Sequence, residues 1–297
     1  MAKEKNEHAQ GHEHTDGKSS PLQAKEHGHE HGHNHPHDHR HDVSHAHHHH
    51  EANTRSGRIL TVRAASGLSG DIMLAGLASI AGLDDQELES LVKELKLPVL
   101  EGTVKIEARS INHIAGVGCN ITLPHEHAHR SLGDIRKMIA DSAMPDEARE
   151  LSNRAFVILG EAEAAVHGKR LDEVTFHEVG ALDSILDTCL VCRIFTILNP
   201  ARFVCSPLPV TDGVIHCAHG HVASPAPAVL RLLEGMPVTA FAGTGETVTP
   251  TAVSLLKALG AEFGGWPGMT IEKTVISYGT KVFENAPNGA IWALGVE

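Results

Sequence analysis

The segment Phe176-His177-Glu178-Val179-Gly180-Ala181-Leu182-Asp183-Ser184 leads from a polar turn into the most apolar helix of the chain. His177 and Glu178 stand side by side on the predicted turn. Asp183 and Asp187 lie four residues apart on the helix that follows, so they share one of its faces. This segment therefore connects a turn with an imidazole and a carboxylate to the most apolar helix of the chain.

A second polar segment, His216-Cys217-Ala218-His219-Gly220-His221, follows a predicted short strand pair. Both polar segments lie at the end of a regular element, which predicts that they converge on one site. Neutral imidazole, carboxylate and thiolate together suit a borderline transition metal such as nickel or zinc. For any single histidine, satisfying a core turn is an equally good interpretation. For the set, a metal site is the prediction.

Composition limits the classes of function. The 297 residues suffice for one large or two small domains. Acidic residues outnumber basic ones, 37 to 25, and aromatics make up 3%, so we expect no nucleic-acid partner. We expect no membrane partner either, because no apolar stretch is long enough to span a bilayer and no signal peptide is recognisable. Five cysteines at irregular spacing predict a reducing, cytoplasmic location.

Residues 1–56 form a histidine-rich tail. Sixteen of the 25 histidines lie in the first 50 residues, and apolar residues are almost absent, so we expect disorder. Closely spaced imidazoles bind nickel, copper and zinc. A purification tag is the alternative, but these histidines alternate with Gly, Asp and Glu instead of forming one run. The predicted metal ligands of the tail are His29, His31, His33, His35, His37, His39, His47, His48, His49 and His50.

A turn rich in glycine and serine connects a predicted strand, Arg58 to Arg63, to a predicted helix, Ile72 to Ala81. The first N–H groups of a helix attract anions, and Ser69 is placed to cap this helix. Asp71 would repel a bare phosphate, so a metal ion or a basic residue has to mediate. Capping and packing explain the turn about as well as phosphate binding. The candidate phosphate-binding residues are Ser66, Gly67, Ser69, Gly70 and Asp71.

A third cluster, His125, His127 and His129, lies on a predicted extended loop whose alternation places the three on one side. A solvated loop and a relay for the same metal are equally good interpretations. Cys189 and Cys192 lie in the middle of the apolar helix with no second pair nearby. This context predicts buried small hydrophobes rather than a redox or metal motif.

The remaining pattern mixes helices and strands. Helices are predicted over residues 84–96, 131–140 and 146–168, and after Pro225 and Thr249. Strands are predicted over residues 103–108, 116–123, 203–205, 214–216, 238–241, 269–276 and 290–296. We therefore expect a single mixed α/β (α+β) domain at residues 57–297, behind the disordered tail at 1–56, with no internal repeat.

Six ordered motifs resemble the LarC family, the nickel-insertion proteins for the nickel-pincer nucleotide cofactor of lactate racemase. The motifs are SGLSGDIM (Ser66–Met73), AEAAVHG (Ala162–Gly168), FHEVGALDSI (Phe176–Ile185), SPLPV with HCAHG (Ser206–Gly220), SPAPA (Ser224–Ala228) and ETVTPTA (Glu246–Ala252). The loop at His125 to His129 also fits, and the resemblance covers about residues 58–288. This chain departs from the family pattern at Arg63, at Thr175 and at Lys281, where the family usually has Asp, His and Arg.

The resemblance implies a lyase-type nickel chelatase (a cyclometallase) acting on pyridinium-3,5-bisthiocarboxylic acid mononucleotide. Nickel is bonded to two sulfurs and a ring carbon, so a base must remove a ring proton. His177, Glu178 and Asp183 are the candidate catalytic residues. The candidate nickel ligands are His177, His216, Cys217 and His219, and the phosphate is expected at Ser66 to Gly70.

Full-length members of that family continue beyond Pro287-Asn288 into a domain associated with CTP and a divalent cation. We therefore expect a separate C-terminal subunit to supply that domain, or a narrower function. Other expected partners are a recipient racemase-like enzyme and a second copy of the chain in a homo-oligomer. A non-catalytic nickel storage or delivery protein remains the alternative, favoured by Arg63 and by the shorter chain. A third interpretation, a role in zinc or copper homeostasis, rests on the tail alone, because imidazole binds nickel, copper and zinc without strong selectivity.

Overall fold

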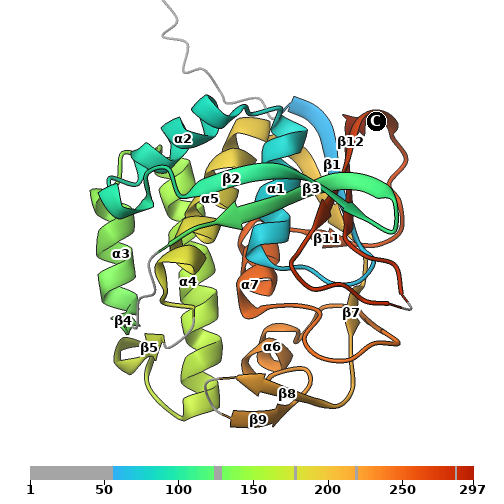
Figure 1. The fold of residues 1–297 in the computed structure, drawn as a ribbon. Coiled ribbons are helices and arrows are strands. Elements are labelled where there is room, and N and C mark those ends of the chain that lie inside the picture. The colour runs from blue at the N-terminus through green and yellow to red at the C-terminus, as the bar shows by residue number, and fades with distance from the viewer. Residues whose placement is uncertain (1–55, 124–128, 177–178, 218–219, 285) are drawn as a thin grey trace, which may run out of the picture. The chain divides into compact units, whose positions relative to one another are not determined.

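The main sheet combines strands from the start, the middle and the end of the chain. The computed structural model describes residues 56–123, 129–176, 179–217, 220–284 and 286–297, all within one compact unit, Glu51–Glu297. The strands of this sheet are β1 (Ser56–Ala64), β2 (Val104–Ile111), β3 (Ile114–Ile121), β6 (Pro200–Cys205), β11 (Glu262–Phe263), β12 (Thr270–Tyr278) and β13 (Ala290–Val296). Their order across the seven-stranded sheet is β11-β6-β1-β13-β12-β3-β2 (Figure 1).

Strand β1 is a buried interior strand of this sheet. It pairs in parallel with β6 and antiparallel with β13, so that Leu60 lies opposite both Phe203 and Leu294. Every residue from Ile59 to Ala64 is buried, as expected for a strand covered on both faces. The strand ends at the turn that carries the candidate phosphate-binding residues, so the core of the sheet fixes where that turn begins.

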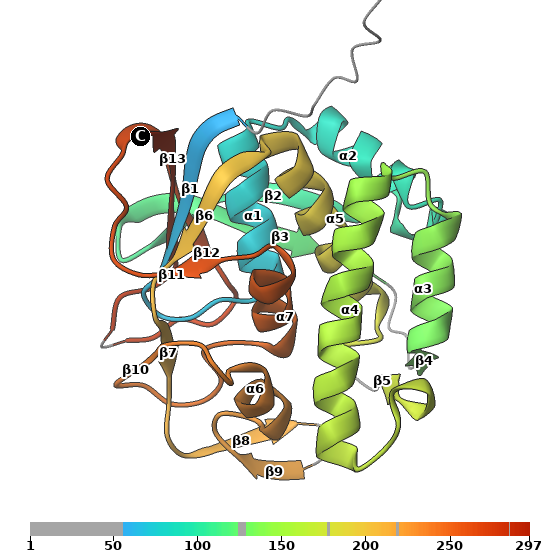
Figure 2. The ribbon, with the colours of Figure 1, turned by 180° about the vertical axis from the view of Figure 1, so that it is seen from behind.

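The longer helices cover the sheet in layers. They are α1 (Gly70–Ala81), α2 (Asp85–Glu94), α3 (Leu132–Asp141), α4 (Asp146–His167), α5 (Leu182–Leu198), α6 (Pro227–Leu232) and α7 (Pro250–Ala258). Short 3-10 helices span Pro98–Leu100 and Leu171–Glu173. Helix α1 packs on β3, β12 and β13 and against α5, while α4 packs on α5, α6 and α7. In both views α1 and α7 lie between the strands and α4 (Figure 1, Figure 2).

A glycine allows α1 to approach the sheet closely. A Cβ on Gly76 would overlap with the indole of Trp292 in β13, which is fully buried. Nε1 of Trp292 donates a hydrogen bond to Oγ of Ser277 at 2.8 Å, so the indole is held in place from the neighbouring strand. The close contact fixes α1, and with it the turn at the start of α1, relative to the sheet.

Three small two-stranded sheets lie outside the main sheet. The pairs are β4 (Arg130–Ser131) with β5 (Thr175–Phe176), β7 (Leu208–Val210) with β10 (Val238–Ala240), and β8 (Val214–Cys217) with β9 (Gly220–Ala223). The β8–β9 hairpin lies beside α6, near the C-terminal end of α4 (Figure 2). It therefore brings the second polar segment to the same end of the unit as the end of α4.

The expected mixed α/β fold is confirmed, with corrections in detail. The short strands β4, β5, β7, β9 and β11 were not predicted, because strands of two to four residues carry too little periodicity to detect. Cys189 and Cys192 are fully buried, as predicted, and burial raises the pKa of Cys189 to about 12. Within the described residues, no helix is long and apolar enough to cross a bilayer.

Ser69 occupies the N-cap position of α1 with an extended backbone, as predicted. Its side chain, however, accepts no hydrogen bond from the first backbone N–H groups of the helix. Its hydroxyl instead donates to the carboxylate of Asp71. The serine therefore orients Asp71 and leaves the first N–H groups of α1 without a side-chain cap.

Candidate functional site

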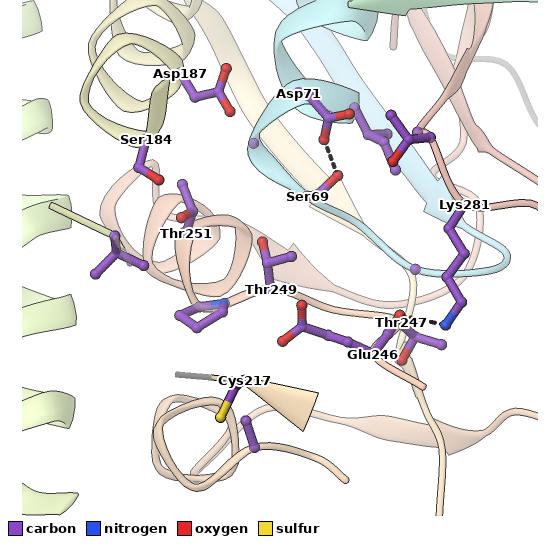
Figure 3. A pocket seen from close by; sticks show the side chains of 18 of the residues that line it. Ser69, Asp71, Ser184, Asp187, Cys217, Glu246, Thr247, Thr249, Thr251 and Lys281 are labelled. Atoms are coloured by element: carbon purple, nitrogen blue, oxygen red, sulfur yellow. Dashed lines mark hydrogen bonds between the residues drawn. The ribbon is translucent and has the colours of Figure 1, made fainter. Parts of the chain in front are cut away.

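The starts of four helices border one cavity of about 1350 Å³. Residues at the starts of α1, α5, α6 and α7 line it, together with the β8–β9 hairpin and the turn Gly279-Thr280-Lys281. Figure 3 shows part of this lining, with α1 and α5 facing one another and β8 on the opposite side. Helix starts carry partial positive charge, so their convergence favours an anionic ligand.

Two of these helix starts are joined by backbone hydrogen bonds. Leu68 donates its N–H to the carbonyl of Thr247 at 2.9 Å, and Thr249 donates to the carbonyl of Leu68 at 3.1 Å, forming a short parallel bridge between Leu68 and Val248. Gly67 has a φ of +125°, and a Cβ there would overlap with the Thr247 carbonyl. The bridge thus requires glycine at this position.

The structure brings together many of the predicted site residues. Those that line the cavity are Ser66, Gly67, Ser69, Gly70, Asp71, Asp183, His216 and Cys217. They come from three segments that are far apart in the sequence. The candidate phosphate turn, the start of the apolar helix and part of the His-Cys segment therefore share one cavity.

Several predicted residues lie outside the described part of the chain. They are His177, Glu178, His219, His125, His127 and all the tail histidines. His129 is described and exposed, and it is not among the residues that line the cavity. In the described ranges, no three His, Cys, Asp or Glu side chains are close enough together to hold a metal ion.

His221 belongs to the second polar segment but was not among the candidate nickel ligands, and it lies directly opposite His216 in the β8–β9 register. The two rings meet edge to face, with their centroids 5.0 Å apart. Cys217 follows His216 on the same strand and is partly exposed. The predicted hairpin could have pointed to His221. Residues paired directly across two antiparallel strands lie on the same face of the sheet, so the partner of His216 shares its face.

Lys281 was noted only as a departure from the family pattern, yet it lines the cavity. Its Nζ donates to the carbonyls of Thr244 at 2.6 Å and Glu246 at 3.3 Å, which uses two of its three donors. Partial burial lowers the pKa of Lys281, and Glu246 opposes that shift. Among the described lining residues it is the one lysine or arginine. It therefore supplies the basic group that the turn at Ser66 to Asp71 lacks.

Carboxyl groups dominate the rest of the charged lining. Asp71, Glu163, Asp183, Asp187 and Glu246 all line the cavity. Asp183 is exposed and accepts a hydrogen bond from the N–H of Ser184 at 2.7 Å. Asp187 is buried, and desolvation together with the charges of Asp71 and Asp183 raises the pKa of its carboxyl well above the usual range.

His167 lines the cavity, whereas Arg63 does not. His167 at the end of α4 lines the cavity, with Nε2 3.4 Å from Oε2 of Glu163, so this end of α4 is not only a solvated face. Arg63 lies away from the cavity: its Nη1 donates to the carbonyl of Gly264 at 3.0 Å and its guanidinium lies over Trp266. The arginine is therefore part of the packing around β1, and its presence does not alter the cavity.

Comparison with known proteins places the chain in a family. The model of the nickel insertion protein family matches residues 60–294. A putative nickel insertion protein of Syntrophotalea carbinolica is 40% identical over 226 residues, which is 75% of this chain and 56% of that protein. The corresponding protein of Myxococcus xanthus is 38% identical over 242 residues, covering 80% of this chain and 60% of that protein.

A third relative has a more specific name. The pyridinium-3,5-bisthiocarboxylic acid mononucleotide nickel insertion protein of Staphylococcus epidermidis is 37% identical over 223 residues, covering 75% of this chain and 55% of that protein. The chain thus spans between 55% and 60% of the length of these relatives. No solved structure matches the chain.

Proposed function

The chain belongs to the nickel insertion protein family, and on that premise we propose that it inserts nickel into a pyridinium-3,5-bisthiocarboxylic acid mononucleotide. Nickel and the mononucleotide are both substrates of this reaction. The observation that carries the proposal is the shared cavity, which joins an anion-favouring turn to a strand bearing imidazole and thiol groups. A storage protein needs many equivalent ligands but no such cavity.

The phosphate of the mononucleotide is proposed to bind where α1 and α7 begin. The first N–H groups of α1 have no side-chain cap, and helix starts favour anions. Lys281 lines the same cavity and has a third donor beyond its two carbonyl partners. This lysine offsets the repulsion that Asp71 would otherwise exert on a phosphate.

Nickel is proposed to enter from the β8–β9 hairpin. His216 and Cys217 line the cavity there, and imidazole and thiolate both bind nickel well. His177, Glu178 and His219 complete the proposed ligand set from outside the described residues, with His125, His127, His129 and the tail histidines as a delivery route. A loosely held ion at this point can pass to the two sulfurs of the substrate.

Insertion also needs a proton acceptor. The two thiocarboxylates flank one ring carbon, so nickel held by both sulfurs lies beside the C–H bond of that carbon. The bond pair passes to nickel while a base takes the proton. We assign this base to the segment His177-Glu178, with Asp183 at the start of α5 as the neighbouring carboxylate that lines the cavity.

The cavity does not fit CTP. Its described lining holds one lysine against five carboxyl groups, so the cavity lacks the cluster of basic side chains that would balance the three phosphates of a nucleoside triphosphate. In this proposal the chain itself does not use CTP. Any CTP-dependent, lyase-type step takes place on a separate C-terminal subunit. In this proposal the product passes to a racemase-like enzyme in the cytoplasm, where thiols stay reduced.

The decisive experiment measures formation of the metallated mononucleotide by mass spectrometry. It uses the full chain with nickel and the nickel-free mononucleotide, with and without CTP, Mg²⁺ and the C-terminal part of a full-length relative. We expect His177→Ala, His216→Ala and Cys217→Ser each to lower the insertion rate about 10- to 100-fold. Total nickel per chain should hardly change, because the tail supplies most ligands.

Two controls make the outcome decisive. His113→Ala removes an exposed histidine in the β2–β3 turn and should leave the rate unchanged. Lys281→Ala should mainly raise KM for the mononucleotide, and Lys281→Arg should restore it. Unchanged insertion by the double variant His177→Ala, His216→Ala would rule out this site, and absence of insertion under all conditions would favour storage.

A further inference from the structure

Two histidines lie directly opposite one another on the β8–β9 hairpin. The register pairs His216 of β8 with His221 of β9. Their rings meet edge to face, with centroids 5.0 Å apart and planes inclined at 76°. Residues paired directly across antiparallel strands have Cβ atoms about 4.5–5.5 Å apart, so the backbone itself brings the two imidazoles together. The hairpin therefore presents them as a pair.

Both imidazoles lie on the more exposed face of the hairpin. His216 is exposed and Cys217 is partly buried along β8, and His221 is exposed along β9. Successive side chains of a strand point to opposite faces, so Cys217 points away from the face that carries the two rings. Exposed rings do not fill the core, so core packing does not explain why two polar rings lie against one another here.

The spacing of the rings suits two ligands of one metal ion. Histidine nitrogens bind zinc at about 2.0–2.1 Å, which places each ring centre about 3.2 Å from the ion. Two rings on one ion, at angles between about 90° and about 110°, then have centres about 4.5–5.2 Å apart. The observed 5.0 Å lies within this range. Because rotation about χ2 of histidine is inexpensive, directing one nitrogen of each ring at a shared ion does not require the strands to move.

The pair leaves most of the coordination sphere of such an ion open. In the part of the chain that the structure describes, no third His, Cys, Asp or Glu completes a cluster with the two rings. Structural zinc sites are closed by four protein ligands, whereas sites that exchange a ligand keep a position open. Imidazole suits nickel, copper and zinc better than magnesium. Such a pair is suited to holding one of these ions temporarily, with water in the remaining positions.

We propose that His216 and His221 form a two-imidazole clamp that holds one nickel ion on the hairpin before insertion. His221 is the new ligand, and it lies just beyond the motif that ends at Gly220. Cys217, on the opposite face, does not bind this ion. The choice of nickel and its later transfer to the mononucleotide rest on the proposed function, whereas the clamp itself is defined by metal binding.

Protection from diethylpyrocarbonate, which modifies free imidazole nitrogens, tests the clamp on the full chain without the mononucleotide. Mass spectrometry of peptides measures the modification of each histidine at pH ~7.5, where imidazole is neutral. Nickel is titrated beyond the capacity of the tail. We expect His216 and His221 to become protected at the same nickel concentration. In His221→Ala, His216 should need at least about tenfold more nickel, and the reverse should hold in His216→Ala, because the second imidazole binds at a high effective concentration.

His113 is the internal control. It is exposed in the β2–β3 turn, so it should be protected only at the higher nickel concentration that a single imidazole needs. His113→Ala and Cys217→Ser should leave the protection of the pair unchanged, and circular dichroism establishes that each variant is folded. The clamp is overturned if each ring is protected independently of the other, or if both need as much nickel as His113. It is also overturned if Cys217→Ser weakens protection as much as the loss of a ring.

The clamp and the proposed function fail separately. Reciprocal protection of the two rings in a chain that inserts no nickel would retain the clamp and contradict the proposed function. Nickel insertion by a chain whose two rings are protected independently would retain the proposed function and overturn the clamp.

Discussion

The N–H of Leu68 donates a hydrogen bond to the carbonyl of Thr247 at 2.9 Å, and this bond aligns the starts of α1 and α7. The two residues lie far apart in the sequence. Their contact places the turn at Ser66 to Asp71 beside the segment that leads into α7, and both line the same cavity. The anion-favouring part of the site is thus a tertiary feature built from two separate segments.

Gly67→Ala should break this arrangement. The new Cβ would overlap with the Thr247 carbonyl, and φ at this position is +125°, so the backbone has to move. We expect a loss of about 2–4 kcal/mol in the free energy of unfolding, measured with urea. Gly213→Ala is the matched control, since Gly213 has a φ of +117° but nothing near its Cβ position. Equal losses in the two variants would show that only backbone strain, and not the contact with Thr247, matters.

Asp187→Asn should change how stability depends on pH. Burial and the charges of Asp71 and Asp183 raise the pKa of Asp187 in the folded state, so the folded chain keeps this proton to a higher pH than the unfolded chain, whose Asp titrates near pH ~3.9. Stability from this group is therefore full below pH ~3.9 and is lost as pH rises toward the folded pKa.

Asp187→Asn removes the titrating carboxyl group, so this loss of stability with rising pH disappears. The stability of Asp187→Asn relative to the unsubstituted chain should therefore grow as pH rises from about 4 toward the raised pKa of Asp187. The free energy of unfolding is measured with urea at each pH, in the presence of a chelator that removes divalent cations. The control is Asp141→Asn, which changes an exposed carboxylate at the end of α3. Parallel stability curves for Asp187→Asn and the unsubstituted chain would contradict the buried, protonated state of Asp187.

Thiol labelling should distinguish Cys217 from the other cysteines. Cys119, Cys189, Cys192 and Cys205 are buried and Cys217 is partly exposed. Burial also raises the pKa of Cys205 to about 12, and thiolate is the reactive form. We expect one fast-reacting thiol per native chain at pH 8, five in urea and none in native Cys217→Ser. Two or more fast thiols in the native chain would contradict the burial pattern.

Removing residues 1–55 should separate metal capacity from folding. The segment has almost no apolar residues, so the urea midpoint of the remaining chain should not change. Nickel bound per chain, measured by atomic emission, should fall sharply. In the full chain most of this nickel should be released between pH 7 and pH 5, because imidazole must be neutral to bind metal. A large drop in the melting temperature of the shortened, metal-free chain would contradict this prediction.

The sequence by itself determined the main elements and their chemistry. A strand was predicted at Arg58 to Arg63, and the helix after Gly180 was recognised from its length and apolar content. Thr249 was predicted as the cap of a helix, and its side chain does accept from the N–H of Ala252 at 3.3 Å. These features are local: propensity, periodicity and capping act within a few residues, so the sequence displays them directly.

Only the tertiary structure decided which of these elements share a cavity. The sequence showed that Asp183 and Asp187 share a helix face, but not that Asp187 is buried against the start of α1, where Gly70 makes room for it. Nor did it show that Lys281 lies beside a turn more than 200 positions earlier in the chain. Such contacts depend on how the strands are ordered in the sheet and on how closely α1 packs on Trp292. These are long-range relationships that no local pattern encodes.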